Sequence, residues 1–288
     1  MFPTILTGNF PISLFLRGFD RLLFCAGIGI ALALSASCAA PAYQKLDQQA
    51  EQSGFTRSTV QGGSFRHVLY ASEKRSEDTI HIYIDGDGVN WQWNRFVKAD
   101  PTPGRSLMLD LMKTDQGNVL YLGRPCYLGL ELDDGCDADY WTYERYSEKV
   151  VSSMVEVINA EADQYRNVVL IGHSGGGALA LLVAERLPAV TAVVTIAGII
   201  DTDAWTSHHG HTRLVGSLNP AKRDQLSANI KQLHLVGALD QNMPPFLVRQ
   251  WVERQHGARL WEVTENSHMC CWNRNWPAVL EWIASVTG

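Results

Sequence analysis

The sequence has 288 residues, of which 46% are hydrophobic and 19% charged, and its formal net charge is -6. This composition is ordinary for a globular protein and leaves ample length for one large core. Because the negative charge falls after the first 38 residues, the body of the chain is acidic, which argues against nucleic acid or an anionic membrane as its main partner.

The N-terminal segment has the features of an export signal. Two arginines precede an apolar run at 22–34 that is too short for a membrane-spanning helix, and small residues follow it. We therefore expect residues 1–38 to be a signal sequence and the protein to be exported, to the periplasm, the outer membrane or the medium. Cys38 resembles the cleavage box of bacterial lipoproteins and predicts a lipid anchor, with ordinary cleavage near Ala36 or Ala40 as the alternative.

Export places the cysteines of the mature chain in an oxidising compartment, where they form disulfides. Cys126 and Cys136 would close a short loop of glycines and aspartates, so this pair is the first choice. Cys270 and Cys271 then remain as an adjacent pair or as free thiols, and pairing across the two sets, such as Cys126 with Cys270, stays open. No spaced set of cysteines and histidines predicts a metal centre, and we expect no cofactor.

The first elements of the folded domain are a hairpin and a strand. Residues 39–54 are polar and predict a short helix or a tether. Runs at 56–60 and 65–70, separated by two glycines, predict an antiparallel hairpin. A third strand at 79–84 leads directly into a loop with the sequence Asp85-Gly86-Asp87-Gly88.

Two tryptophans, Trp91 and Trp93, follow this glycine loop. Their large, rigid rings are candidates for the walls of a substrate pocket, with buried packing as the alternative. A helix at 106–112, a fourth strand at 118–122 and a helical stretch within 140–165 come next.

The branched apolar run at 167–171 is typical of a strand buried on both faces, and an alanine- and leucine-rich helix at 178–186 follows. Between them lies the G-x-S-x-G motif centred on Ser174. A serine on a sharp strand-to-helix turn needs strained dihedral angles and neighbours without Cβ atoms. The N terminus of the next helix directs its dipole and free N–H groups at negative charge that forms beside this serine.

We therefore expect Ser174 to be a nucleophile. The alternative is a tight turn whose serine caps the helix. A phosphate-binding loop is less favoured, because no Gly-Lys-Ser/Thr sequence follows the motif.

A strand at 191–196 comes next, and residues 202–231 predict a small insertion over the active face. Trp205 in this insertion is a candidate substrate contact. The insertion also contains three histidines, His208, His209 and His211. They lack the fixed helical spacing of metal ligands, so we expect exposed or hydrogen-bonded loop histidines and no metal site.

The last two predicted strands each precede a polar side chain. The strand at 231–239 leads into Asp240, and the strand at 259–263 leads into His268. Since the carboxyl ends of parallel strands share one edge of a sheet, both side chains are expected there beside Ser174. Two more helices are predicted, at 245–256 and 276–286.

The chain order serine, aspartate, histidine is similar to that of the α/β-hydrolases. The resemblance covers about residues 55–288 and rests on Gly172–Gly176, Gly237–Asp240 and His268. It implies an α/β fold with a mostly parallel central sheet of about eight strands and helices on both faces. Three further segments look like an exported bacterial subgroup: Asp85-Gly86-Asp87-Gly88, Gly123-Arg124-Pro125-Cys126 and Tyr140-Trp141-Thr142.

The resemblance also implies a role for each residue. Ser174 attacks an acyl carbon, His268 takes and returns the proton, and Asp240 orients the imidazole. The backbone N–H groups of Gly175 and Asp87 bind the oxyanion, since this family takes its second donor from the loop after the third strand.

The implied function is that of a serine hydrolase acting on a carboxylic ester, thioester or amide of a small-molecule or lipid acyl substrate. An acyltransferase on the same residues and a non-catalytic binding module of the same fold are the alternatives. Asp201, after the preceding strand, is the rival to Asp240 as the acid.

Overall fold

The computed structural model describes residues 40–72, 78–93 and 95–288, and the account below concerns the compact unit from Pro41 to Gly288. The predicted signal sequence, with Cys38, lies outside the described residues. Among the helices in these ranges, none combines the length and the apolar character needed to cross a bilayer.

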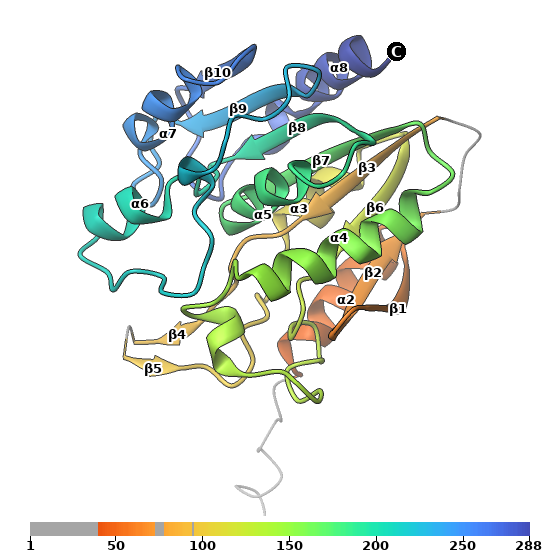
Figure 1. Ribbon diagram of the computed structural model, residues 1–288. Helices are drawn as coiled ribbons and strands as arrows, with labels where there is room; N and C mark the ends of the chain where they lie inside the picture. Colours follow the sequence, from red (N-terminus) through yellow and green to blue (C-terminus); the bar gives the residue numbers. More distant parts are fainter. Residues whose placement is uncertain (1–39, 73–77, 94) are drawn as a thin grey trace, which may run out of the picture. The chain divides into compact units, whose positions relative to one another are not determined.

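An eight-stranded sheet forms the centre of this unit, in the order β1-β2-β6-β3-β7-β8-β9-β10 (Figure 1). The pairs β1–β2 and β2–β6 are antiparallel, and all the others are parallel. This arrangement confirms the predicted mostly parallel sheet. The strands are β1 Thr56–Gly62, β2 Phe65–Ala71, β3 Thr79–Ile84, β6 Asn118–Leu122, β7 Asn167–His173, β8 Val190–Ile196, β9 Lys231–Gly237 and β10 Ala258–Val263.

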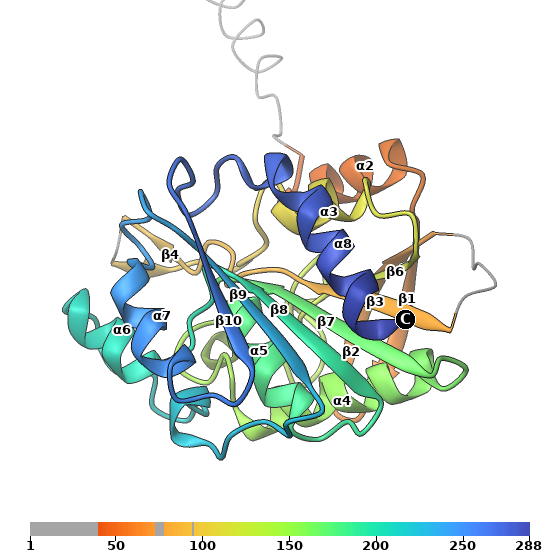
Figure 2. The same ribbon diagram turned by 90° about the horizontal axis from the view of Figure 1, so that it is seen from above.

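Helices cover both faces of the sheet, as predicted. Helices α4 and α5 lie on one face, and α3 and α8 lie on the other (Figure 2). The helices are α2 Ala42–Gln52, α3 Leu107–Met112, α4 Glu148–Ala162, α5 Gly175–Ala184, α6 Thr202–His208, α7 Pro245–Val252 and α8 Trp276–Thr287.

The unit's most deeply buried segment is β7 with the helix that follows it. Every residue of β7 after Asn167 is buried, and so is every residue of α5. This double burial explains why the sequence is continuously apolar here and shows no amphipathic period. Helix α4 begins later than the sequence suggested, because the Ser147 hydroxyl accepts a hydrogen bond from the Val150 N–H and caps the helix there.

The segment 39–54, expected as a helix or a tether, contains α2 and is not a free tether. Leu46 and Ala50 are buried in the core. The Gln49 amide donates hydrogen bonds to the Ser106 carbonyl at 2.8 Å and to Asp110 Oδ1 at 2.9 Å. The domain boundary near residue 55 is therefore corrected to Pro41, where the compact unit begins.

Two small features beside the sheet had no clear signal in the sequence. Strands β4 (Trp91–Gln92) and β5 (Phe96–Val97) form a separate antiparallel hairpin (Figure 1). Helix α6 and a 3-10 turn at Pro220–Lys222 lie within the insertion at 202–231.

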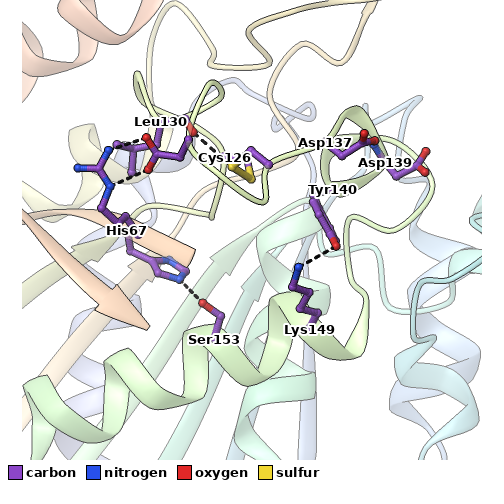
Figure 3. The surroundings of a disulfide bond; sticks show 11 residues. His67, Cys126, Leu130, Asp137, Asp139, Tyr140, Lys149 and Ser153 are labelled. Atoms are coloured by element: carbon purple, nitrogen blue, oxygen red, sulfur yellow. Dashed lines mark hydrogen bonds and ion pairs between the residues drawn. A yellow bond between two sulfur atoms is a disulfide. The ribbon is translucent and has the colours of Figure 1, made fainter. Parts of the chain in front are cut away.

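The first-choice disulfide is confirmed, since Cys126 and Cys136 are joined (Figure 3). Cys270 and Cys271 form the adjacent pair, so pairing across the two sets does not occur. Near the first disulfide, Lys149 Nζ at the start of α4 donates to the Tyr140 hydroxyl at 3.1 Å, in the 3-10 turn Ala138–Trp141 that follows the disulfide loop.

Three histidines, His67, His173 and His234, are buried. Burial lowers the pKa of His67 to about 4 and the pKa values of His173 and His234 to about 3. In the unfolded chain a histidine takes up its proton near pH 6.5, so the unfolded state binds more protons than the folded state between about pH 4 and 6.5. The stability from these residues is present above pH 6.5 and is lost as the pH falls below it.

Lowering the pH from 7 to 5 should therefore cost about 2 kcal/mol of unfolding free energy for each buried histidine. Urea unfolding followed by tryptophan fluorescence measures this cost. In His234→Gln the loss should be about 2 kcal/mol smaller than in the wild type, whereas the exposed His256→Gln control should match the wild type. Equal losses in wild type and His234→Gln would contradict the account.

Candidate active site

Ser174 lies at the sharp turn between β7 and α5, with φ at 53° in the left-handed region. The neighbouring glycines make this turn sterically feasible. A Cβ on Gly172 would lie 2.2 Å from the Gly176 carbonyl oxygen, and a Cβ on Gly176 would lie 2.2 Å from the Ile84 carbonyl oxygen. Both contacts are too short for any side chain, so the G-x-S-x-G spacing follows from the packing of α5 against β7 and β3.

A hydrogen-bonded chain joins Ser174 to two residues that follow other strands. Ser174 Oγ lies 3.0 Å from His268 Nε2, and His268 Nδ1 lies 2.8 Å from Asp240 Oδ2. Because the carboxylate only accepts, Nδ1 carries the hydrogen and Nε2 presents its lone pair to the serine hydroxyl. The structure thus brings the three predicted residues together at the carboxyl ends of β7, β9 and β10.

Asp240 is held as a charged, buried acceptor. Its Oδ1 accepts hydrogen bonds from the N–H groups of Asn242 and Met243, each at 2.8 Å. Burial alone would raise the pKa of Asp240, but the hydrogen bond from His268 and those from these two N–H groups lower it below its usual value.

The rival acid Asp201 has a different role in the structure. Its Oδ1 accepts from the N–H groups of Asp203 and Ala204 and caps α6. The Asn219 amide donates to the same oxygen. Within the described residues Asp201 makes no hydrogen bond to His268, so the geometry favours Asp240 as its partner.

The backbone of His268 is also fixed. The buried ring of His173 donates from Nε2 to the His268 carbonyl oxygen at 2.9 Å, and the Trp272 indole N–H donates to the same oxygen at 3.2 Å. His173, the variable residue of the serine motif, thereby ties the serine turn to the loop that carries His268.

Asn242 is a site residue that sequence reasoning missed. Its amide Nδ2 lies 3.0 Å from His268 Nε2, where it donates to the same lone pair as the serine hydroxyl. The main-chain carbonyl oxygen of Asn242 accepts hydrogen bonds from Trp205 Nε1 at 3.1 Å and from His209 Nε2 at 2.8 Å. The one signal for Asn242 was its position two residues after Asp240.

The two predicted oxyanion donors are free to bind a ligand. The loop after β3 passes beside the serine, because a Cβ on Gly86 would lie 3.2 Å from Ser174 Cβ. Neither the Gly175 N–H nor the Asp87 N–H donates a hydrogen bond to any residue that the structure describes. Unpaired N–H groups beside a nucleophile are the donors that stabilise a developing oxyanion.

The side chain of Asp87 anchors this loop. Its carboxylate forms ion pairs with Arg124 and with Arg145 Nη1, the latter at 2.8 Å, and accepts from the Tyr146 hydroxyl at 2.7 Å. The Tyr127 hydroxyl donates to the Asp87 carbonyl oxygen. Burial acts to raise the pKa of Asp87, but the two arginines hold it well below its usual range.

A cavity of about 390 Å³ lies beside this anchor, between the β4–β5 hairpin and the insertion. Two of the three predicted substrate contacts, Trp91 and Trp205, line it. Trp93 does not line it. Its φ of 52° interrupts the alternation of side chains after β4, and Trp93 is 81% exposed, with its ring edge-on to that of Phe96. The prediction that Trp93 lines a pocket is corrected accordingly.

The histidines of the insertion contact other rings and the backbone. His209 donates to the Asn242 carbonyl and stacks on His211 with ring centroids 5.4 Å apart. His208 packs edge-on against Phe246. In the described ranges, no three histidine, cysteine, aspartate or glutamate side chains are grouped as metal ligands.

No protein-family model and no curated protein matches the sequence. The structure is similar to those of several solved proteins. An esterase from Pyrococcus furiosus is 13% identical with a TM-score of 0.59, over 83% of this chain and 95% of that chain. A bacterial membrane phospholipase A is 12% identical with a TM-score of 0.53, over 93% and 99%. A serine hydrolase involved in carbazole degradation is 12% identical with a TM-score of 0.54, over 81% and 98%.

Proposed function

Since the chain has the α/β-hydrolase fold, we propose that it is a serine hydrolase that cleaves a carboxylic ester, a thioester or an amide. The observation that carries the proposal is the hydrogen-bonded chain of Ser174, His268 and Asp240. A hydroxyl at its ordinary pKa is a poor nucleophile, and this arrangement supplies the base that it needs.

In the proposed reaction, Ser174 Oγ attacks the acyl carbon while its proton moves to His268 Nε2. The tetrahedral oxyanion binds to the N–H groups of Gly175 and Asp87. His268 then protonates the leaving group, and an acyl-enzyme remains on Ser174. Water attacks this ester with His268 again as the base, and the product acid leaves. Asp240 stabilises the imidazolium in both halves of the reaction.

The substrate class is part of the same proposal. The solved structures that this fold resembles include an esterase and a phospholipase, which favours a small-molecule or lipid acyl ester. The cavity with walls that include Trp91 and Trp205 provides room for the apolar part of such a substrate.

A panel of acyl esters, thioesters and amides of varied chain length tests the proposal. The wild type should turn over at least one class, Ser174→Ala should be inactive, and Ser227→Ala, an exposed serine away from the site, should retain wild-type rates. Transfer of the acyl group to an added alcohol in preference to water would identify an acyltransferase instead. No turnover of any compound would leave the binding module as the better account.

We also propose that the protein is exported. The basic residues and apolar run of the N-terminal segment support this, and so do the two disulfides, which form in oxidising compartments. N-terminal analysis of protein from a bacterial host should show loss of everything before residues 36–40. A lipid-modified Cys38 would identify a membrane anchor, and an intact N terminus would overturn the proposal.

A further inference from the structure

A buried cation faces the cavity between the β4–β5 hairpin and the insertion. Arg145 is only 6% exposed and lines the cavity wall. Its Nε donates to the Thr142 carbonyl oxygen, and its Nη1 donates to Asp87 Oδ2. Its Nη2 donates to no residue that the structure describes, and Nη2 is not among the atoms sealed from solvent. One edge of the guanidinium is therefore open to a ligand in the cavity.

Arg145 shares its counterion with a second arginine. Asp87 is the carboxylate that both Arg124 and Arg145 contact, and the nearby Asp85, which interacts with Arg124, does not line the cavity. No aspartate or glutamate is among the described residues that line the cavity. Burial, together with His209 and Arg145, lowers the pKa of His211, so Arg145 is the charged side chain of this wall at neutral pH. A buried cation that shares its counterion and keeps unpaired N–H groups favours the binding of an anion.

Two residues of the cavity wall are connected to the catalytic residues through one intermediate side chain or loop each. On one side Arg145 holds Asp87, and a Cβ on Gly175 would lie only 2.0 Å from Asp87 Oδ1, next to the serine. On the other side Trp205 donates to Asn242, whose amide contacts His268. From these two connections we infer that a substrate with its ester at Ser174 places its other end in this cavity.

We propose that Arg145 binds an anionic group of the substrate, a carboxylate or a phosphate, while the aromatic walls contact the apolar part of the same molecule. This inference rests on the proposed hydrolase function and names its substrate class: esters that carry a second, negatively charged end. A guanidinium recognises such oxygens directionally. Because Asp87 and Thr142 already fix the Arg145 side chain, binding costs little conformational entropy.

The test uses matched pairs of p-nitrophenyl esters of dicarboxylic acids of increasing chain length, with the far carboxylate either free or methylated. A phosphate-terminated series distinguishes the two anions, and a third series carries the charged group on the alcohol side. For at least one length, kcat/KM of the charged ester should exceed that of its neutral partner by about 10- to 100-fold, the usual range for a charge-assisted hydrogen bond. A ratio at or below one for every series would overturn the inference.

Variants separate recognition from a merely structural role of Arg145. Arg145→Gln should bring the ratio of charged to neutral kcat/KM close to one, whereas Arg249→Gln, an exposed arginine paired with Glu262, should keep the wild-type ratio. If Arg145→Gln does not fold, Thr212→Asp keeps the inference testable, because it adds a negative charge to the cavity wall and leaves Arg145 in place. Thr212→Asp should lower the ratio relative to Thr212→Asn, and an unchanged ratio would contradict the inference.

Failure of the inference and failure of the proposed function give different results. If Ser174-dependent turnover occurs without any preference for charge, the function stands and the inference fails. If no ester is hydrolysed, calorimetric binding of the charged and methylated esters to Ser174→Ala still tests Arg145. Tighter binding of the charged ester, lost in Ser174→Ala combined with Arg145→Gln, would support the inference without the hydrolase function.

Discussion

Replacing His268 with alanine should lower kcat by about 10⁶-fold if Ser174 and His268 act as a unit, as in serine proteases. Ser174 Oγ has His268 Nε2 as its base at 3.0 Å, and no other described histidine is placed to replace it. His173 is buried, donates from Nε2 to the His268 backbone and has a pKa lowered to about 3 by burial. His209 uses its Nε2 on the Asn242 carbonyl.

The measurement is kcat on the best ester of the panel, with KM determined in the same series. His256→Ala, at an exposed histidine in the connection between α7 and β10, serves as the matched control and should retain wild-type kcat. Retention of more than about a hundredth of the wild-type kcat in His268→Ala would mean that another group acts as the base, since a general base contributes about 10²- to 10⁴-fold even on its own.

Asp240→Asn should lower kcat by about 10⁴-fold, the size of the effect expected when the acid of a serine-protease triad loses its charge. The asparagine would keep the volume of the side chain but would no longer stabilise the imidazolium of His268 or fix its tautomer. The 2.8 Å contact between Asp240 Oδ2 and His268 Nδ1 is the geometric basis of this expectation.

Asp201→Asn is the matched control, because it makes the same chemical change one strand earlier. Asparagine is as good a helix cap as aspartate, so α6 should be retained and kcat should change little. The opposite pattern, with Asp201→Asn severely impaired and Asp240→Asn mild, would move the acid to Asp201 while the fold would be unchanged.

Much of the site can be predicted from the sequence, because steric rules restrict which residue types can occupy its turns. A Cβ on Gly172 or Gly176 would lie 2.2 Å from a backbone oxygen, so only glycine fits at these positions. The two glycines of the motif therefore predict the sharp turn at Ser174. Asp240 and His268 lie in the loops that follow β9 and β10, and parallel strands bring their carboxyl ends to one edge. Local sequence and strand direction therefore placed Ser174, Asp240 and His268 at one edge of the sheet, whereas the choice of Asp240 over Asp201 needed the contacts of the folded chain.

The remainder of the site depends on contacts between distant parts of the chain. Arg145 meets Asp87 across 58 positions of sequence, and nothing in the local pattern around either residue predicts the pair. Strands β4 and β5 have two residues each, too few for a periodic signal, so the direction of Trp93 could not be predicted. Asn242 contacts His268 through its side chain in an irregular loop, where side-chain direction has no regular period.

The most direct test of the central claim is covalent labelling of the folded protein with a fluorophosphonate, which reacts with serines that a base has activated. Intact-mass analysis and peptide mapping should show a single adduct on Ser174 in the wild type. The adduct should be absent from Ser174→Ala and from denatured wild type, and nearly absent from His268→Ala. A folded wild type that takes no label, or takes it on another residue, would contradict the assignment of Ser174 as the nucleophile.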